Sequence, residues 1–290
     1  MISAKIIKDS IAPTGKRLTT FELEYPRFIH AEVMTHKMLS KNSASSRALP
    51  YKSMLDLVKK NMAMPIHWGK HQSGMGADFE LTGWKLWTAQ KLWIWSGLLM
   101  TLFAWTMGKI GLAKQVTNRI LEPWTHIKIV MTGTEFDNFF YLRNHKDAQP
   151  EIHELARLMY ECYSKSLPML LDYGEWHLPY IDTVKTEADT LYFSTSDLKS
   201  LSYGLSLTDA KKISASMCAQ VSYRKNDQSL DKAYRIYQRL VESKPVHASP
   251  FEHQGTPLPD STAISGNFRG WKQFRSEIPG NTCFKYQGSK

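Results

Sequence analysis

The segment from Glu32 to Arg47 gathers side chains that could bind a phosphorylated ligand. It carries imidazole, ammonium, hydroxyl, amide and guanidinium groups in one short stretch, at His36, Lys37, Ser40, Asn42, Ser45 and Arg47. A guanidinium binds phosphate oxygens in pairs, and hydroxyls and amides can bind the edge of a uracil ring. The same residues could instead cap a helix end and face solvent. From spacing alone, both interpretations stay open.

Other patterns that carry chemistry are missing. The sequence has no GxGxxG after a strand, no Walker loop, no HExxH and no GxSxG. His67 and His71 flank Gly69 in an expected loop, so surface histidines are favoured over metal ligands. The 3 cysteines are widely spaced and form no CxxC pair, which argues against a disulfide framework and against structural zinc. We therefore expect no metal site.

Several elements must position the Glu32–Arg47 segment. Apolar and polar residues alternate over 18–25, which predicts a strand. Pro26 opens a predicted helix over 26–39, and a turn rich in Ser and Asn follows. A short strand is expected at 126–131, with Thr132 or Thr134 capping the next helix. Further helices are predicted over 53–62, 84–114, 135–143, 150–167, 209–223 and 230–243, and the stretch from 244 to 290 is predicted to be mostly loop. No composition break marks a linker.

The run from Leu92 to Met107 is almost entirely apolar. It is about as long as the shortest membrane spans, which need roughly 17–25 apolar residues. Because nothing else in the chain is typical of a membrane protein, we favour a helix buried on all sides, in a core or a subunit interface. We expect no membrane partner.

The composition indicates a folded, basic protein. Apolar residues make up 42% of the 290 residues and charged residues 22%, which excludes a disordered or collagen-like chain. The formal net charge is +10, yet no Lys/Arg run concentrates it, so a pocket for small phosphorylated ligands fits as well as nucleic acid. The N-terminus lacks the apolar stretch of a signal peptide, which favours the cytoplasm.

The stretch THKMLSKNSASSR resembles the signature of flavin-dependent thymidylate synthase (ThyX), which reads Arg-His-Arg, seven residues, Ser, any residue, Arg. His36, Ser45 and Arg47 match this signature. Thr35 and Lys37 stand where the family has its two leading arginines. Glu32 stands where the family usually has Gln.

Three further stretches resemble the same family. NRILEP (118–123) is similar to its Ala-Arg-x-x-Leu-Pro segment, and residues 138–156 are similar to its Phe-Leu-x-Leu-Arg…Ala-Gln-x-Glu-Ile segment. AQVSY (219–223) and SPFEH (249–253) are similar to stretches that contact the flavin. In the family as usually arranged, these last two precede the strand and the Arg-His-Arg helix, so the chain resembles a circular permutation. GNFRGWKQFR (266–275) echoes the signature faintly, and we assign it no role.

The permuted order makes a spatial prediction. His253 should lie beside the strand 18–25 and the Glu32–Arg47 segment, because permutation is tolerated where the old termini lie close together. The implied fold is α+β: a single domain over 1–290, rich in helix, with a small antiparallel sheet, a helical insertion at 65–115 and a loop-rich tail at 255–290.

The resemblance implies an enzyme that reductively methylates dUMP to dTMP. It implies FAD as cofactor, methylenetetrahydrofolate and NADPH as co-substrates, and a homotetramer with active sites at subunit interfaces. The implied catalytic residues are Ser45 and Arg143. Those implied to bind dUMP are Glu32, Ser45, Arg47, Arg119 and Arg143, and those implied to bind FAD are His36, Lys37, Asn138, Ser222 and His253.

The departures from the signature keep two alternatives open. Thr35 removes a positive charge, Lys37 loses the planar fork of an arginine, and a carboxylate at Glu32 cannot donate unless it is protonated. One alternative is a related flavoenzyme that adds another C5 group, such as hydroxymethyl, to a pyrimidine nucleotide. The other is a non-catalytic protein that binds nucleotides or nucleic acid.

Overall fold

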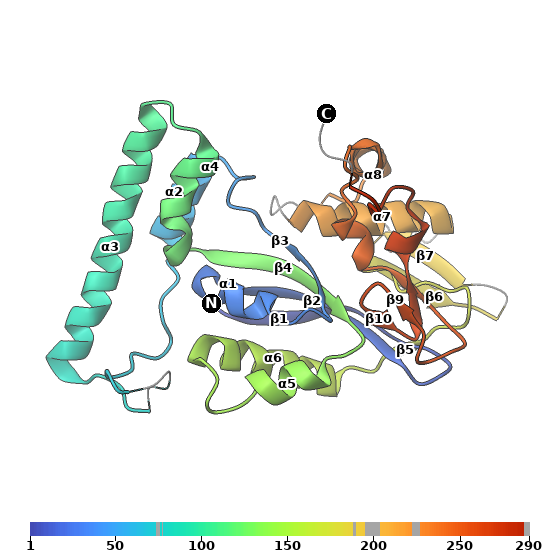
Figure 1. Cartoon of the computed structure of the whole chain (residues 1–290), viewed down its shortest axis with the longest axis horizontal. Helices are drawn as coiled ribbons and strands as arrows, with labels where there is room; N and C mark the ends of the chain where they lie inside the picture. The colour runs from blue at the N-terminus through green and yellow to red at the C-terminus, as the bar shows by residue number, and fades with distance from the viewer. Residues whose placement is uncertain (74–75, 77, 188–189, 195–203, 222–226, 287–290) are drawn as a thin grey trace.

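The chain folds around a small central sheet (Figure 1). A computed structural model describes all residues except 74–75, 77, 188–189, 195–203, 222–226 and 287–290. In the described part, the strand order of this five-stranded sheet is β3–β4–β2–β1–β5. All neighbours pair antiparallel except β1 and β5, which pair parallel. The strands are β1 (Ser3–Ile11), β2 (Arg17–Pro26), β3 (Ser40–Ser43), β4 (His126–Gly133) and β5 (Met169–Leu170). The expected small antiparallel sheet in an α+β fold is thus confirmed.

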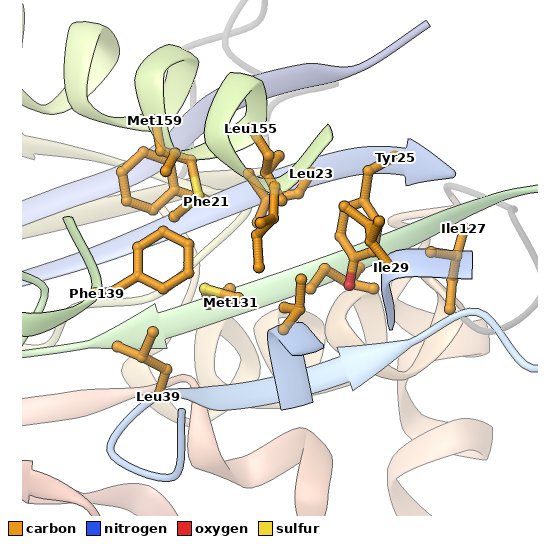
Figure 2. Packing of buried hydrophobic residues seen from close by; sticks show 14 of the residues in the cluster. Phe21, Leu23, Tyr25, Ile29, Leu39, Ile127, Met131, Phe139, Leu155 and Met159 are labelled. Atoms are coloured by element: carbon orange, nitrogen blue, oxygen red, sulfur yellow. The ribbon is translucent and has the colours of Figure 1, made fainter. Parts of the chain in front are cut away.

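One face of the sheet packs against α5 (Asp137–Arg143) and α6 (Pro150–Lys165), which lie below the sheet in Figure 1. Alternate residues of β2 point into this layer because successive side chains of a strand face opposite ways. Figure 2 shows Phe21 and Leu23 of β2 against Leu155 and Met159 of α6, with every one of these side chains buried. This layer fixes the position of α5, which contributes to the site described below.

The opposite face of the sheet packs against the C-terminal part of the chain. Val130 of β4 contacts Cys218 and Val221, at the end of α7 (Leu207–Gln220). A second core joins α7 to α8 (Leu230–Glu242) and to the hairpin of β6 (Ile181–Lys185) and β7 (Thr190–Ser194). The tail contains η5 (Ser249–Glu252), β8 (Gly255–Pro257), β9 (Ile264–Ser265), β10 (Phe268–Arg269), β11 (Trp271–Gln273) and η6 (Phe274–Glu277). The stretch predicted to be mostly loop therefore includes four short strands, which pair in two small sheets.

The helix expected over 26–39 is much shorter. A 3-10 turn, η1 (Arg27–Ile29), leads into α1 (His30–Met34), and the Thr35 hydroxyl donates to the Glu32 carbonyl at 2.6 Å just after the helix ends. The expected turn then contains β3, whose Ser40 pairs with Thr132 of β4. Since Thr132 belongs to β4, and Phe136 is the residue before α5, the predicted capping of α5 by Thr132 or Thr134 is wrong.

The apolar segment forms most of α3 (Gly83–Lys109), beside α2 (Tyr51–Lys60), α4 (Lys114–Thr117) and the 3-10 helix η2 (Asn118–Trp124). Only Gly97, Thr101 and Ala104 of α3 are buried. Its large exposed apolar side chains are Trp84, Trp87, Leu92, Trp95, Leu98, Leu99, Leu102, Phe103 and Trp105. A helix buried on all sides is thus the wrong expectation within one chain, because α3 lies at the edge of the fold. None of the described helices has the length and apolar character that a membrane crossing requires.

Candidate functional site

A pocket of about 340 Å³ lies between the turn after α1 and α5. We call it the site pocket; its lining includes Thr35, His36, Lys37, Asn138 and Arg143. Four of these, all but Thr35, are candidates named from the sequence. They converge because β3 and β4 pair at the end of the sheet where α5 begins. Long-range pairing therefore joins segments about a hundred residues apart.

A close backbone approach holds the turn in place. A side chain at Gly133 of β4 would overlap Leu39, which is buried and follows the turn. Lys41 donates to the carbonyl of Leu39 at 3.0 Å and to that of His36. Glycine at 133 therefore lets Leu39 anchor the turn that presents His36 and Lys37 to the pocket.

Arg143 and His36 form the central contact of the site pocket. Arg143 Nε donates to His36 Nε2 at 2.9 Å, and another of its nitrogens donates to Thr35 Oγ1 at 3.4 Å. Burial lowers the pKa of His36 most, and the positive charges of Arg143 and Lys41 add to this, so that the pKa is about 4. At neutral pH His36 is therefore an uncharged acceptor at Nε2, with its proton on Nδ1. Threonine at position 35 gives Arg143 an acceptor and adds no positive charge.

Glu32 lies next to this pair. Burial raises the pKa of Glu32, Arg143 opposes that rise, and the nearby Glu151 adds to it. Its Oε2 is buried and makes no hydrogen bond with the described residues. A carboxyl group with a raised pKa holds a proton more readily, and in that form it can donate a hydrogen bond.

Ser45, Arg47 and Arg119 lie away from the site pocket in a single chain. Ser45 and Arg47 follow β3 at the end opposite to Leu39, and Arg47 is exposed. Arg119 lies on η2 with 57% of its side chain exposed and pairs with Glu122 at 3.1 Å. Asn118 donates to the Ser46 carbonyl at 2.7 Å, so these two segments are neighbours. These three candidates thus form a separate group at the far end of β3.

His253 lies where the permuted order predicts. Its Nδ1 is 2.8 Å from Thr132 Oγ1, and Thr132 pairs with both Thr20 of β2 and Ser40 of β3. The predicted proximity to strand 18–25 and to the Glu32–Arg47 segment is confirmed. His253 is fully buried, which lowers its pKa to about 3, and it does not line the site pocket. Ser222 lies outside the described residues.

A buried chain of hydrogen bonds extends from His253 across the sheet. Thr132 Oγ1 lies 2.8 Å from Thr20 Oγ1, which lies 2.8 Å from His177 Nε2, and His177 Nδ1 lies 2.9 Å from Ser10 Oγ. All five side chains that these hydrogen bonds connect are fully buried. Burial, the charge of Lys8 and the neighbouring His253 lower the pKa of His177, so both imidazoles are neutral.

Sequence reasoning missed a second set of polar residues, in the tail. Asn267, Gln273 and Arg275 line a pocket of about 520 Å³ together with Lys37 and Lys41. We call it the tail pocket. The available signal was the faint echo of the signature in GNFRGWKQFR, to which we assigned no role. The pairing of β8 with β11 brings that stretch against β3.

The fold and site together define a mixed α/β protein with a basic, histidine-containing pocket at one end of a small sheet. Residues 17–169 match the family described as thymidylate synthase complementing protein. The chain belongs to this family, which is the one that the motifs resemble.

Two similar solved structures show a UMP/dUMP methylase, PolB, from Streptomyces cacaoi. One is bound with 5-Br UMP, with 15% identity, a TM-score of 0.43, and coverage of 59% of this chain and 90% of that chain. The other is bound with 5-Br dUMP, with 14% identity, a TM-score of 0.44, and coverage of 59% and 91%. No curated protein matches the sequence of this chain.

Proposed function

We propose that this protein is a flavin-dependent enzyme that reductively methylates dUMP at C5, with methylenetetrahydrofolate as carbon donor and NADPH as reductant. The observation that carries the proposal is the convergence of His36, Lys37, Asn138 and Arg143 on the site pocket. Membership of the thymidylate synthase complementing protein family supports the same reaction. We further propose that the enzyme acts in the cytoplasm.

The donor groups of the site pocket fit a flavin. Phe139 and Leu142 supply apolar surface for a ring, while His36, Lys37 and Asn138 supply hydrogen-bond donors beside it. These three polar residues would hold the cofactor. A reduced flavin supplies the hydride that a reductive methylation needs.

We propose that Arg143 is the residue of the site pocket that binds the pyrimidine nucleotide. Its guanidinium has five N–H donors, and His36 and Thr35 accept from two of its nitrogens. A charge-assisted bond from a remaining donor would orient an anionic or polarised group of dUMP. Because His36 is neutral and accepts from Arg143 Nε, it holds the guanidinium in place without repelling it.

The separation of Arg47 and Arg119 from the site pocket supports an active site shared between subunits. Both are exposed in one chain, where a second copy could meet them. The exposed apolar face of α3 supports such an assembly, because burial of apolar surface contributes about 25 cal/mol per Å². We propose a homotetramer in which Ser45, Arg47 and Arg119 of one chain complete the site of another.

Mutation of α3 tests the assembly. Leu99→Asp should lower the molar mass measured by light scattering after gel filtration, since it places a charge on the exposed apolar face. Leu230→Asp is the matched control, because Leu230 is similarly exposed but lies on α8. Equal masses for both variants and the parent would contradict an interface at α3.

Mixing two inactive variants tests the shared site. Arg119→Ala and Arg143→Ala should each lose activity alone and recover part of it when the subunits are exchanged. Recovery requires that the two residues of one site come from different chains. Two inactive variants that fail to recover after verified exchange would place both residues of a site in one chain.

A product assay tests the reaction itself. The protein is incubated with dUMP, FAD, methylenetetrahydrofolate and NADPH, and the nucleotide is weighed by mass spectrometry. We expect a gain of one methyl group that depends on FAD and is lost in Arg143→Ala, but not in Arg157→Ala, a surface control on α6. A hydroxymethyl-sized gain would support the alternative suggested by Thr35, Lys37 and Glu32. No product and no bound flavin would favour a non-catalytic binding protein.

A further inference from the structure

The tail pocket adjoins the site pocket. Lys37 and Leu39 line both, so the turn after α1 forms a wall between the two spaces. The opposite wall of the tail pocket comes from the C-terminal tail, chiefly β11 and the residues around it. A ligand that reaches past Lys37 would therefore contact both pockets.

Hydrogen bonds fix the walls of the tail pocket. The Ser40 hydroxyl donates to Asn267 Oδ1 at 2.8 Å, and Asn267 Nδ2 donates to the Lys37 carbonyl at 3.4 Å. Gln273, only 3% exposed, places Nε2 within 3.0 Å of both Asn267 Oδ1 and the Glu252 carbonyl. These buried polar contacts hold the tail against β3, so the pocket is built before any ligand binds.

Positive charge exceeds negative charge around the tail pocket. Its lining carries Lys37, Lys41 and Arg275 against a single carboxylate, Glu252, which pairs with Arg275. In the part of the chain that the structure describes, no carboxylate forms an ion pair with Lys37 or Lys41. Burial and the neighbouring Lys37 lower the pKa of Lys41, Glu252 opposes this, and the resulting pKa is about 8. An anion between the two lysines would relieve their repulsion.

The chemistry of the lining selects the anion. Guanidinium and ammonium groups with amide and hydroxyl donors around them are the partners of a phosphate group. The volume of about 520 Å³ lies within the range of small-molecule sites. We propose that the tail pocket binds the phosphate group of a nucleotide ligand that also enters the site pocket, with Lys37, Lys41 and Arg275 as its partners.

This inference deepens the proposed function and rests on it for the neighbouring site. Two sources could supply the phosphate: the monophosphate of the nucleotide substrate, or the diphosphate of a dinucleotide cofactor. In both cases the C-terminal tail supplies a residue, Arg275, that recognises the ligand. The tail would thus complete a site whose other residues precede it by more than two hundred positions.

Binding measurements on the full-length protein test the proposal without turnover. Titration calorimetry gives the Kd of dUMP, of FAD and of inorganic pyrophosphate for the parent, Lys41→Gln and Arg275→Gln. Each variant should bind at least one of the two nucleotides with a Kd about tenfold higher or more, because one charge-assisted contact is lost. Lys272→Gln is the matched control: Lys272 lies on β11 in the same tail, pairs with Glu277 at 2.8 Å and lines neither pocket.

The pattern of losses identifies the source of the phosphate. Weaker dUMP binding alone assigns the pocket to the substrate monophosphate, and weaker FAD binding alone assigns it to the cofactor diphosphate. Pyrophosphate should compete with the affected nucleotide in the parent. Arg275→Lys keeps the charge and should retain binding within a few-fold, which separates a lost charge from a disturbed tail.

Unchanged binding of both nucleotides in Lys41→Gln and Arg275→Gln would overturn the proposal. Such a result leaves the proposed function intact if Arg143→Ala still weakens dUMP. Conversely, weaker binding in the tail variants with unchanged dUMP binding in Arg143→Ala would support the tail pocket and contradict the role proposed for Arg143. The two proposals therefore fail separately.

Discussion

Removal of the Thr132 hydroxyl tests whether the buried hydrogen-bond chain holds the C-terminal part against the sheet. Thr132→Val keeps the shape of a fully buried side chain and deletes two hydrogen bonds of 2.8 Å, to Thr20 and to His253. His253 Nε2 already lacks a hydrogen-bond partner among the described residues. The variant would therefore leave both nitrogens of a fully buried imidazole unsatisfied.

The expected cost follows from these two bonds. A buried polar group left unsatisfied costs about 1–3 kcal/mol, so we expect Thr132→Val to lower the free energy of unfolding by about 2–4 kcal/mol. With an unfolding entropy of roughly 2.1 cal/mol/K per residue, a chain of 290 residues should melt about 3–7 °C lower. Calorimetry at neutral pH measures both quantities.

Thr256→Val is the matched control. Thr256 is also buried, but its hydroxyl has no hydrogen-bond partner among the described residues. Replacing an unsatisfied hydroxyl with a methyl group should change the free energy of unfolding little or raise it. Both variants exchange the same two groups in buried surroundings, so their difference isolates the hydrogen bonds.

Hydrogen exchange supplies a local readout. The backbones of His177 and Gly255 form two hydrogen bonds with each other, of 2.8 and 3.2 Å, next to the buried chain of hydrogen bonds. Their amides should exchange faster in Thr132→Val than in Thr256→Val, because the contact that positions His253 is lost. Equal melting temperatures and equal exchange in the two variants would refute the argument that this chain of hydrogen bonds joins the two parts.

Three further outcomes are expected. Burial lowers the pKa of both His177 and His253, the latter to about 3, so these histidines are protonated in the unfolded chain at a higher pH than in the folded one. The free energy of unfolding should therefore decline from about pH 6.5 towards pH 3. Replacing both histidines with Gln should flatten that decline, as measured by urea titration. Burial raises the pKa of Glu32, so its charged form destabilises the fold above that pKa. Glu32→Gln should raise the melting temperature at pH 7, and this gain should vanish near pH 4. An equal gain at both pH values would contradict this cause. Gly133→Ala should lower the free energy of unfolding by about 1–3 kcal/mol, because its methyl group would overlap Leu39; an unchanged urea midpoint would show that the turn after α1 adjusts freely.

The sequence predicted well those elements whose patterns are local. The alternation over 18–25 anticipated β2, and Pro150 with spaced apolar residues anticipated α6, because both signals depend on neighbours in the chain. It failed for residues 40–43, where Ser and Asn favour a turn. Those residues form a strand because β4, which is distant in the sequence, offers them an edge to pair with.

The candidate site also has a part that the sequence predicted and a part that it did not. The motif resemblance supplied His36, Lys37, Asn138 and Arg143, and the structure gathers these four at one pocket. Residue type gave no sign that Arg119 would lie apart from them in a single chain. The tail residues Asn267 and Arg275 received no role from the sequence because hydrogen bonds between distant segments, not local spacing, bring them to β3.

By itself, the sequence determined the chemical groups that this protein can use, its positive charge, most of its helices and the family it resembles. Tertiary structure alone decided that α3 keeps an apolar face exposed, that His253 reaches the sheet through Thr132, and that Lys37 separates two pockets. The physical reason is the range of the interactions. Backbone propensity and hydrophobic periodicity act over a few residues, whereas strand pairing, burial and pKa shifts depend on which distant segments meet.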